Sequence, residues 1–162
     1  MGFEGSYVWQ LRQKIGNDLL LLPAADVLAF DDAERLLLMR RADTGCWSVP
    51  GGCAEPGSTF AQTAVRELEE ETGLCVDPAG LEPFASHSDP AVKTYPNGDQ
   101  VQAFLMCFAA FTWTGTPRPV DGEALELGFF ARQELPEDRN PYVDEVLSLW
   151  DAYRKTGLFQ AC

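Results

Sequence analysis

The sequence contains few of the residues that several common kinds of functional site require. It has one histidine, and its five cysteines include no C-x-x-C pair, so we do not expect a zinc site. The count of cysteines is odd and their spacing gives no hint of a disulfide framework, so reduced thiols in a cytoplasmic protein are the simpler interpretation. No apolar run approaches the roughly 18 residues of a membrane span, and no signal-peptide pattern opens the sequence. We therefore expect a cytoplasmic protein without a membrane segment.

Positive charge is scarce as well. The chain has 12 Lys and Arg residues against 25 Asp and Glu residues, and its formal net charge is -13. A protein that binds long nucleic acid through the phosphates needs a cationic surface, which this composition does not supply. Small phosphorylated substrates remain compatible with the charge, because divalent metal ions hold phosphates well on an acidic protein. We therefore expect a small-molecule partner and no long nucleic acid.

The 162 residues are 46% hydrophobic, which is enough for one ordinary core. Two apolar runs, 18–30 and 35–40, are joined by a turn at Asp31 and Asp32, and they predict a β-hairpin. The mixture of strands and helices predicts an α/β fold, with mixed α+β character and helices on the faces of a sheet. Strands are expected at 18–30, 35–40, 47–52, 100–113 and 124–131, and helices at 7–16, 59–72 and 142–157.

The segment 51–74, GGCAEPGSTFAQTAVRELEEETGL, contains an unusual helix. Thr59 and Gln62 fit a capping box, in which each side chain satisfies the other residue's free backbone N–H. Gly73 fits the left-handed residue that ends a helix. The helical repeat places one set of residues on the side that packs against the sheet: Ala61, Ala64, Val65, Leu68 and Thr72.

Three carboxylates, Glu67, Glu70 and Glu71, project from one arc of this helix at positions i, i+3 and i+4. Each like-charge pair costs a few tenths of a kcal/mol, and the helix dipole disfavours anions near a C-terminal end. A solvated face tolerates such charge, and Arg66 supplies one cation. A divalent cation would offset more of the repulsion, and Mg²⁺ and Mn²⁺ prefer oxygen ligands. The preceding WSVPGG, whose glycines let the backbone approach a ligand, favours a metal and diphosphate site.

At these residues the sequence resembles the Nudix box, G-x5-E-x7-R-E-U-x-E-E-x-G-U, in which U is an aliphatic residue. Gly52 matches the first glycine, and residues 66–74 fill the second half of the motif in register. The one departure is Ser58, which stands where the motif has its first glutamate. In the family this glutamate helps to bind or organise a metal, so its replacement would weaken one metal site.

The resemblance extends beyond the motif. WSVPGG before it and GFFARQELP after it look like the flanking strands of the family. We expect three parts: an N-terminal arm or short helix at 1–17, a single Nudix domain at 18–155 and a C-terminal tail at 156–162. Many members of the family are dimers, and the interface of a homodimer would use the N-terminal arm or the C-terminal helix.

The resemblance implies an α/β/α sandwich around a mixed sheet. It implies a Mg²⁺-dependent (or Mn²⁺-dependent) hydrolase that cleaves the diphosphate linkage of a nucleoside diphosphate derivative, either a nucleotide sugar such as ADP-ribose or a nucleoside triphosphate. Glu67, Glu70 and Glu71 would ligate the metal together with the carbonyl of Gly51. With Arg66 they would form the catalytic set, and one carboxylate, directly or through the metal, would activate the attacking water.

Five residues outside the motif are candidates for substrate binding, and each has an ordinary alternative. Arg40 and Arg41 end a strand and could reach a phosphate, or they could be a plain surface pair. Tyr95 could stack on a base and Asp99 could contact the substrate, or both could simply belong to a turn. Glu123 could add a carboxylate opposite the helix, or it could be a surface residue.

Two other functions are compatible with the fold. A non-catalytic module that binds or senses a nucleotide is favoured only by Ser58, and the intact helical carboxylates stand against it. An isopentenyl diphosphate isomerase would need a histidine-rich metal site, which a chain with one histidine does not provide.

Overall fold

The computed structural model describes residues 4–95 and 97–162. In chain order the elements are helix α1 (Tyr7–Ile15), strands β1 (Leu20–Ala29), β2 (Leu36–Arg41), β3 (Trp47–Ser48) and β4 (Gly51–Cys53), helix α2 (Phe60–Thr72), a 3-10 turn (Pro78–Gly80), strands β5 (Glu82–Ser88), β6 (Lys93–Thr94), β7 (Gln100–Ala110) and β8 (Ala124–Phe130), helix α3 (Tyr142–Thr156) and strand β9 (Gln160–Ala161).

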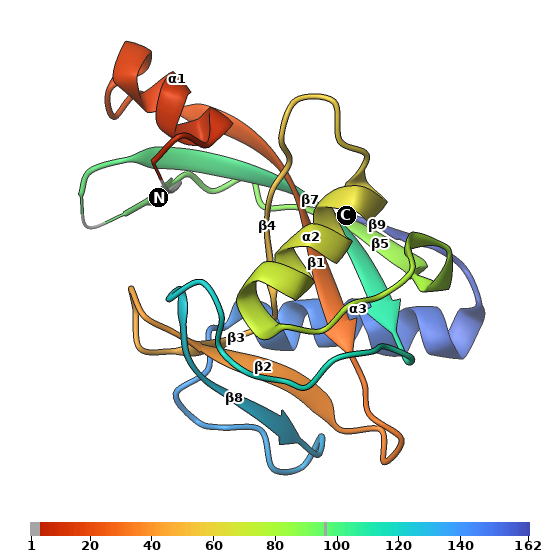
Figure 1. The fold of residues 1–162 in the computed structure, drawn as a ribbon. Helices are drawn as coiled ribbons and strands as arrows, with labels where there is room; N and C mark the ends of the chain where they lie inside the picture. Colours follow the sequence, from red (N-terminus) through yellow and green to blue (C-terminus); the bar gives the residue numbers. More distant parts are fainter. Residues whose placement is uncertain (1–3, 96) are drawn as a thin grey trace.

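The strands form two sheets (Figure 1). The larger is mixed, with the order β4-β1-β7-β5-β9, and β6 also pairs with β7. At its centre β1 runs parallel to β7, in register from Leu20 opposite Val101 to Ala29 opposite Ala110. The smaller sheet is antiparallel, with the order β3-β2-β8.

Helices cover both faces of the larger sheet, with α2 on one face and α3 on the other (Figure 1). Successive side chains of a strand point to opposite faces, and β1 shows this clearly. Val27 packs in the hydrophobic cluster that contains Leu68 of α2, whereas Leu28 packs in the cluster that contains Val146 of α3. Because both faces are buried, β1 is apolar almost throughout. The expected α/β/α sandwich around a mixed sheet is confirmed.

The predicted helices are present, and local chemistry explains where they end. Gly16 closes α1, and Gly73 ends α2 in the left-handed conformation. The capping box of α2 is formed, because Thr59 and Gln62 each accept a hydrogen bond from the other's backbone N–H. The apolar stripe of α3 is buried as expected: Val143, Val146, Leu147 and Trp150.

The hairpin predicted from 18–30 and 35–40 is wrong in its pairing. The turn exists, and Asp31 organises it by accepting hydrogen bonds from the backbone N–H groups of Ala33 and Arg35. The two strands nevertheless share one isolated bridge, Phe30 to Leu36, and then enter different sheets. The turn chemistry sets a chain reversal, whereas the strands that pair with β1 come from distant parts of the chain.

Both ends of the chain pack onto the larger sheet. In the segment predicted as a tail, β9 runs parallel to β5, with Gln160 opposite Ala85. At the other end Val8 of α1 is buried in a small cluster with Leu22 and Val101. Residues 1–3 of the predicted N-terminal arm lie outside the described residues.

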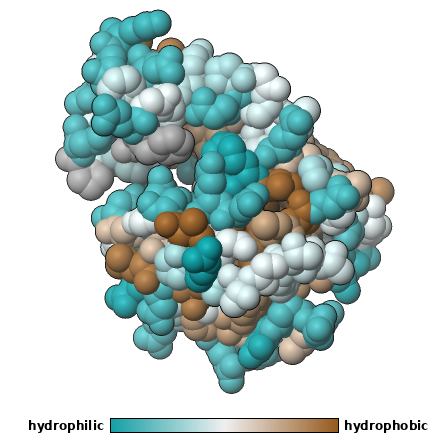
Figure 2. Space-filling view, viewed as in Figure 1, coloured by the Kyte–Doolittle hydropathy of each residue, from teal (hydrophilic) through white to brown (hydrophobic). Residues whose placement is uncertain are grey.

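In the view of Figure 2, hydrophobic residues appear in patches between hydrophilic ones. Within residues 4–95 and 97–162, no helix has the length and apolar character that a membrane span requires.

Candidate active site

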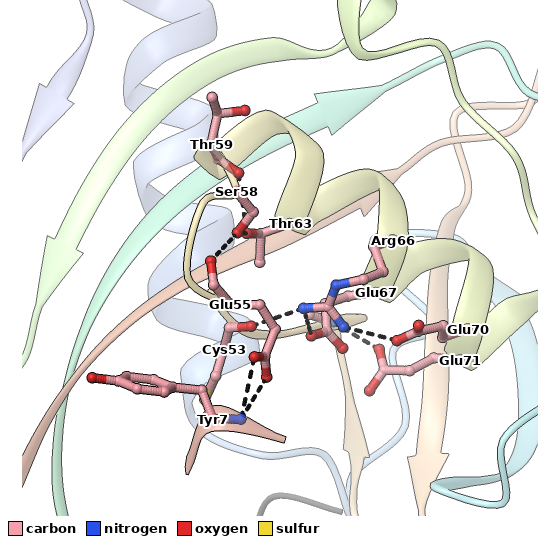
Figure 3. A network of polar contacts seen from close by, with 11 residues as sticks. Tyr7, Cys53, Glu55, Ser58, Thr59, Thr63, Arg66, Glu67, Glu70 and Glu71 are labelled. Carbon is pink, nitrogen blue, oxygen red and sulfur yellow. Dashed lines mark hydrogen bonds and ion pairs between the residues drawn. The ribbon is translucent and has the colours of Figure 1, made fainter. Parts of the chain in front are cut away.

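Helix α2 presents its acidic residues beside the short strand β4, and Arg66 holds the two elements together (Figure 3). Its Nη1 lies 2.8 Å from Oε2 of Glu70, and its Nη2 lies 2.7 Å from Oε1 of Glu67. The same Nη2 donates a hydrogen bond of 2.8 Å to the carbonyl oxygen of Cys53. One guanidinium therefore offsets part of the repulsion between two carboxylates and fixes the end of β4.

Glu71 is the most deeply buried carboxylate of the helix, with 1% of its surface exposed. Its Oε2 accepts a hydrogen bond of 2.8 Å from the backbone N–H of Gly51. Burial raises the pKa of Glu71 well above its usual range, because desolvation outweighs this hydrogen bond and the nearby charge of Arg41. The side chain is thus held by β4 in a place where its negative charge is poorly compensated.

Glu67 packs directly on the backbone of Gly52. A Cβ atom at position 52 would collide with the carboxyl group of Glu67, so the close approach requires a glycine there. Burial raises the pKa of Glu67 to about 7, although Arg66 opposes the shift. The first glycine of the motif therefore makes room for a carboxylate.

These groups fit a hard divalent cation by their chemistry. The carboxylates of Glu67, Glu70 and Glu71 are oxygen donors, and Mg²⁺ prefers oxygen. Across the described part of the chain, no three Asp, Glu, His or Cys side chains already stand close enough together to hold an ion. The physical reason is local, because Arg66 occupies Glu67 and Glu70. A cation here would have to replace part of the contact with Arg66.

A cavity of about 350 Å³ opens beside Gly51, between the larger sheet and the N-terminal end of α3. Eight elements contribute to its walls, and the lining residues include Asp26, Arg41, Gly51, His87, Leu105 and Tyr142. Polar groups and aromatic rings alternate with apolar side chains, which is the usual composition of a small-molecule site. Gly51 both lines the cavity and donates a hydrogen bond to Glu71, so the cavity adjoins the acidic helix at this residue.

The two candidate arginines face different ways, as neighbours on a strand must. Arg41 lines the cavity and pairs with Asp43 at 2.8 Å. That hydrogen bond, helped by the charge of Glu71, raises the pKa of Arg41. The side chain of Arg40 is 44% exposed, and its Nε donates to the carbonyl oxygen of Gly45. Only Arg41 is brought to the candidate site.

Of the remaining candidates, Tyr95 lies at the cavity and Glu123 lies near the acidic helix. Tyr95 lines the cavity, with the Nζ of Lys93 4.7 Å from its ring centre. Glu123 lies near enough to raise the pKa values of Glu67 and Glu71, and burial raises its own pKa.

Asp99 lies elsewhere and pairs with Arg12 of α1 at 3.3 Å. It does not belong to the residues that line the cavity. We therefore leave Asp99 out of the proposed site.

Ser58 and Glu55 are used for structural contacts near the start of α2 (Figure 3). The hydroxyl of Ser58 donates to the carbonyl oxygen of Glu55 at 2.7 Å and lies 3.1 Å from Oγ1 of Thr63. The Glu55 carboxylate accepts a hydrogen bond from the backbone N–H of Tyr7, at the N-terminal end of α1. An anion is favourable at that end of a helix. Neither residue contacts Glu67, Glu70 or Glu71 in this structure.

Asp26 and Tyr142 are among the groups of the cavity that sequence reasoning missed. Asp26 had a readable signal, because it interrupts a strand that is otherwise apolar. It is buried, and the loss of solvation raises its pKa to about 6. Tyr142 had no signal, since one more aromatic residue at the start of an amphipathic helix is ordinary.

A comparison with known protein families identifies the family to which the chain belongs. The NUDIX domain family model matches residues 20–150, and the chain belongs to this family. The residues that match the Nudix motif are those that meet at β4 and α2.

Particular relatives are similar over shorter stretches. The nucleoside triphosphatase NudI of Enterobacter sp. (strain 638) is 36% identical over 62 residues, 38% of this chain and 44% of that protein. The 8-oxo-dGDP phosphatase NUDT18 of Mus musculus is 27% identical over 113 residues, 65% of this chain and 31% of that protein. The chain therefore spans less than half the length of either relative.

Solved structures show the same fold. The MutT NUDIX hydrolase of Burkholderia pseudomallei superposes with a TM-score of 0.68, covering 80% of this chain and 98% of that one, at 23% identity.

Proposed function

We propose that the protein is a Mg²⁺-dependent hydrolase that cleaves the diphosphate linkage of a nucleotide derivative. The observation that carries the proposal is the contact of Glu71 with Gly51 and of Glu67 with Gly52, beside a cavity of small-molecule size. Glu70 lies on the same face of the helix and is joined to Glu67 through Arg66. Packing alone gives no reason to bury Glu67 and Glu71, because their repulsion and desolvation destabilise the folded chain.

The metal would be held by the carboxylates of Glu67, Glu70 and Glu71 and by the carbonyl of Gly51. A bound Mg²⁺ or Mn²⁺ supplies charge neutralisation for the diphosphate and lowers the pKa of a coordinated water. The residues of the chain orient the site around it. Gly51 fixes Glu71 through its N–H, and Arg66 keeps Glu67 and Glu70 on one side of the helix.

The cavity would hold the nucleoside part of the substrate. Arg41 is the cation placed to bind a phosphate, since it lines the cavity and lies close to Glu71. Tyr95 offers a ring on which a base can stack. The names of the relatives, a nucleoside triphosphatase and an 8-oxo-dGDP phosphatase, support nucleoside di- or triphosphates first and nucleotide sugars such as ADP-ribose second.

The setting we propose is the cytoplasm, with a small nucleotide as partner. All five cysteines are free thiols, which suits a reducing compartment. The net charge of -13 disfavours long nucleic acid. A homodimer remains part of the proposal on the family resemblance, with α1 or α3 as the contributing elements.

One observation favours a second function, a nucleotide sensor that does not cleave. Ser58 replaces the first glutamate of the motif, and its hydroxyl is used inside the loop. A sensor would bind nucleotide without needing the helical carboxylates.

The two functions are separated by product release from nucleoside triphosphates, nucleoside diphosphates and ADP-ribose, with Mg²⁺, Mn²⁺ or EDTA. We expect metal-dependent cleavage that falls at least about a hundredfold in Glu70→Gln, because a metal ligand is lost. Glu69→Gln is the matched control, since Glu69 lies on the same helix turn and is exposed. Cleavage by Glu70→Gln at the parent rate would disprove the metal assignment, and tight binding without cleavage would favour the sensor.

A further inference from the structure

One buried carboxylate of the cavity takes no part in the contacts of the acidic helix. Asp26 of β1 lies opposite Gly51 of β4, and 8% of its surface is exposed. Its Oδ2 is buried and has no hydrogen-bond partner among the described residues. A buried carboxylate oxygen is normally paired, because it has lost its hydrogen bonds to water. Asp26 also lines the cavity, so a rotation of its carboxyl group would bring this oxygen to a partner from outside.

The surroundings show what kind of partner fits. Asp26 stands opposite Cys107 in the register of β1 and β7, and the hydroxyl of Tyr142 lies 3.6 Å from the sulfur of Cys107. Leu105, two residues before Cys107, lines the same cavity. Cys107, Leu105 and the ring of Tyr142 thus lie around the Asp26 carboxylate, while the other carboxylates of the cavity, Asp89 and Glu145, come from different elements. Such a site accepts a flat ligand part that presents a hydrogen-bond donor on its edge.

No basic side chain is available to pair with Asp26 directly. Arg41 reaches the cavity, but its guanidinium is joined to Asp43 at 2.8 Å. Lys93 lies over the ring of Tyr95. A cation is a poor candidate too, because in the described segments no group of three ligating side chains includes Asp26. The hydroxyl of Tyr142 lies near enough to lower the pKa of Asp26, and it also approaches the sulfur of Cys107. Oδ2 itself has no partner among the described residues, so a neutral N–H donor of a ligand is the partner that remains for this oxygen.

We propose that Asp26 is a specificity-determining residue, whose carboxylate accepts a hydrogen bond from an N–H group on the edge of the nucleobase that enters the cavity. This inference deepens the proposed function and rests on it for the nucleotide character of the ligand. The carboxylate turns easily about its last side-chain bond, so the oxygen without a partner can meet such a donor. A ligand that lacks the donor leaves the acceptor unpaired, and sites of this kind reject such ligands strongly.

The test is the affinity for nucleoside monophosphates in EDTA, measured by titration calorimetry, so that no metal or cleavage is needed. Three pairs differ mainly in one N–H donor: GMP and IMP, AMP and purine riboside monophosphate, and UMP and its N3-methyl derivative. We expect the parent to prefer the donor-bearing member of at least one pair by about tenfold or more. In Asp26→Asn, whose amide replaces an acceptor by a donor, this ratio should fall to about one.

Asp151→Asn is the matched control, because Asp151 of α3 lies outside the cavity and pairs with Arg132 at 2.8 Å. The order of affinities within each pair should therefore stay unchanged. Thermal unfolding of Asp26→Asn gives the second readout. Removal of a buried charge should leave the unfolding midpoint unchanged or higher.

Three outcomes would overturn the inference. The parent and Asp26→Asn could show the same ratios, as they would if water or Tyr142 satisfies the carboxylate. Every ligand could weaken equally with a lower unfolding midpoint, as for a purely structural residue. No monophosphate could bind at all. Failure of the proposed function would look different. Selective binding without cleavage of any triphosphate would support the role of Asp26 and reject the hydrolase. Cleavage with the same base preference in the parent and in Asp26→Asn would support the hydrolase and reject the role of Asp26.

Discussion

The backbone N–H of Gly51 donates a hydrogen bond to Oε2 of Glu71 over 2.8 Å, and this contact joins β4 to the acidic helix inside the protein. The Glu71 carboxylate is almost fully buried, so its negative charge destabilises the folded state. Its oxygen nevertheless gives the backbone N–H of Gly51 a hydrogen-bond acceptor.

Glu71→Gln should separate these two effects. The glutamine keeps an acceptor for Gly51 but carries no charge, so the unfolding midpoint in EDTA should be unchanged or higher. Metal-dependent turnover should fall at least about a hundredfold, because a ligand of the cation is lost. Glu71→Ala, which also removes the acceptor and leaves a cavity, should lower the unfolding free energy by about 2–4 kcal/mol. Parent-like turnover in Glu71→Gln would show that Glu71 is purely structural.

The pKa of Glu67 predicts how stability changes with pH in EDTA. The folded-state pKa is about 7 against a usual value of 4.5, so the folded state binds the proton more tightly than the unfolded one. The contribution of Glu67 to the unfolding free energy should be largest below about pH 4.5 and should fall by about 3 kcal/mol as the pH rises through 7. The measurement is denaturant unfolding of the parent beside Glu67→Gln from pH 4.5 to 8. Parallel curves for the two proteins would contradict the shift.

Mg²⁺ should act over the same range of pH. A cation binds the deprotonated carboxylates, so the rise in unfolding midpoint on adding Mg²⁺ should be small at pH 5 and larger at pH 8. Glu67→Gln should lose most of this rise. An equal rise at both pH values would place the bound ion away from Glu67.

Gly52→Ala tests the close contact between β4 and α2. The added Cβ would meet the carboxyl group of Glu67, so we expect the unfolding free energy to fall by about 1–3 kcal/mol and turnover to fall with it. Gly80→Ala is the control, because its Cβ would reach only Val76, at 4.0 Å, and should change stability by less than about 1 kcal/mol. Equal effects of the two substitutions would mean that Glu67 moves aside freely.

Arg12 connects α1 to the loop that precedes β7. Its guanidinium donates hydrogen bonds to the carbonyl oxygens of Gly16, Asp18 and Gln100, and it pairs with Asp99, with 8% of its side chain exposed. Arg12→Ala should lower the unfolding free energy by about 3–5 kcal/mol, because a buried carboxylate and three carbonyls lose their partner.

The control for Arg12→Ala is Arg132→Ala, which breaks an exposed pair with Asp151. It should cost less than about 1 kcal/mol. Urea unfolding measures both variants, and a similar small loss in each would show that α1 is held by its apolar contacts instead.

The apolar run 18–30 predicts the strand β1, but the pairing of β1 with β2 that the turn indicates is wrong. A turn such as that at Asp31 acts through neighbouring residues, whereas β1 gains its partner β7 from a segment about 80 residues away. The period of two along β2 implies that Arg40 and Arg41 face opposite sides, and only the packing of the sheets decided that Arg41 reaches the cavity.

The sequence by itself determined the acidic helix: its first turn, its last residue and the arc of Glu67, Glu70 and Glu71 follow from hydrogen bonds and a periodicity that act within one turn. Tertiary structure decided the cavity, the pairing of Asp99 with Arg12, and the position of Asp26 beside Gly51. These depend on which distant segments become neighbours, and that is set by the burial of both faces of the central strands, which no local pattern encodes.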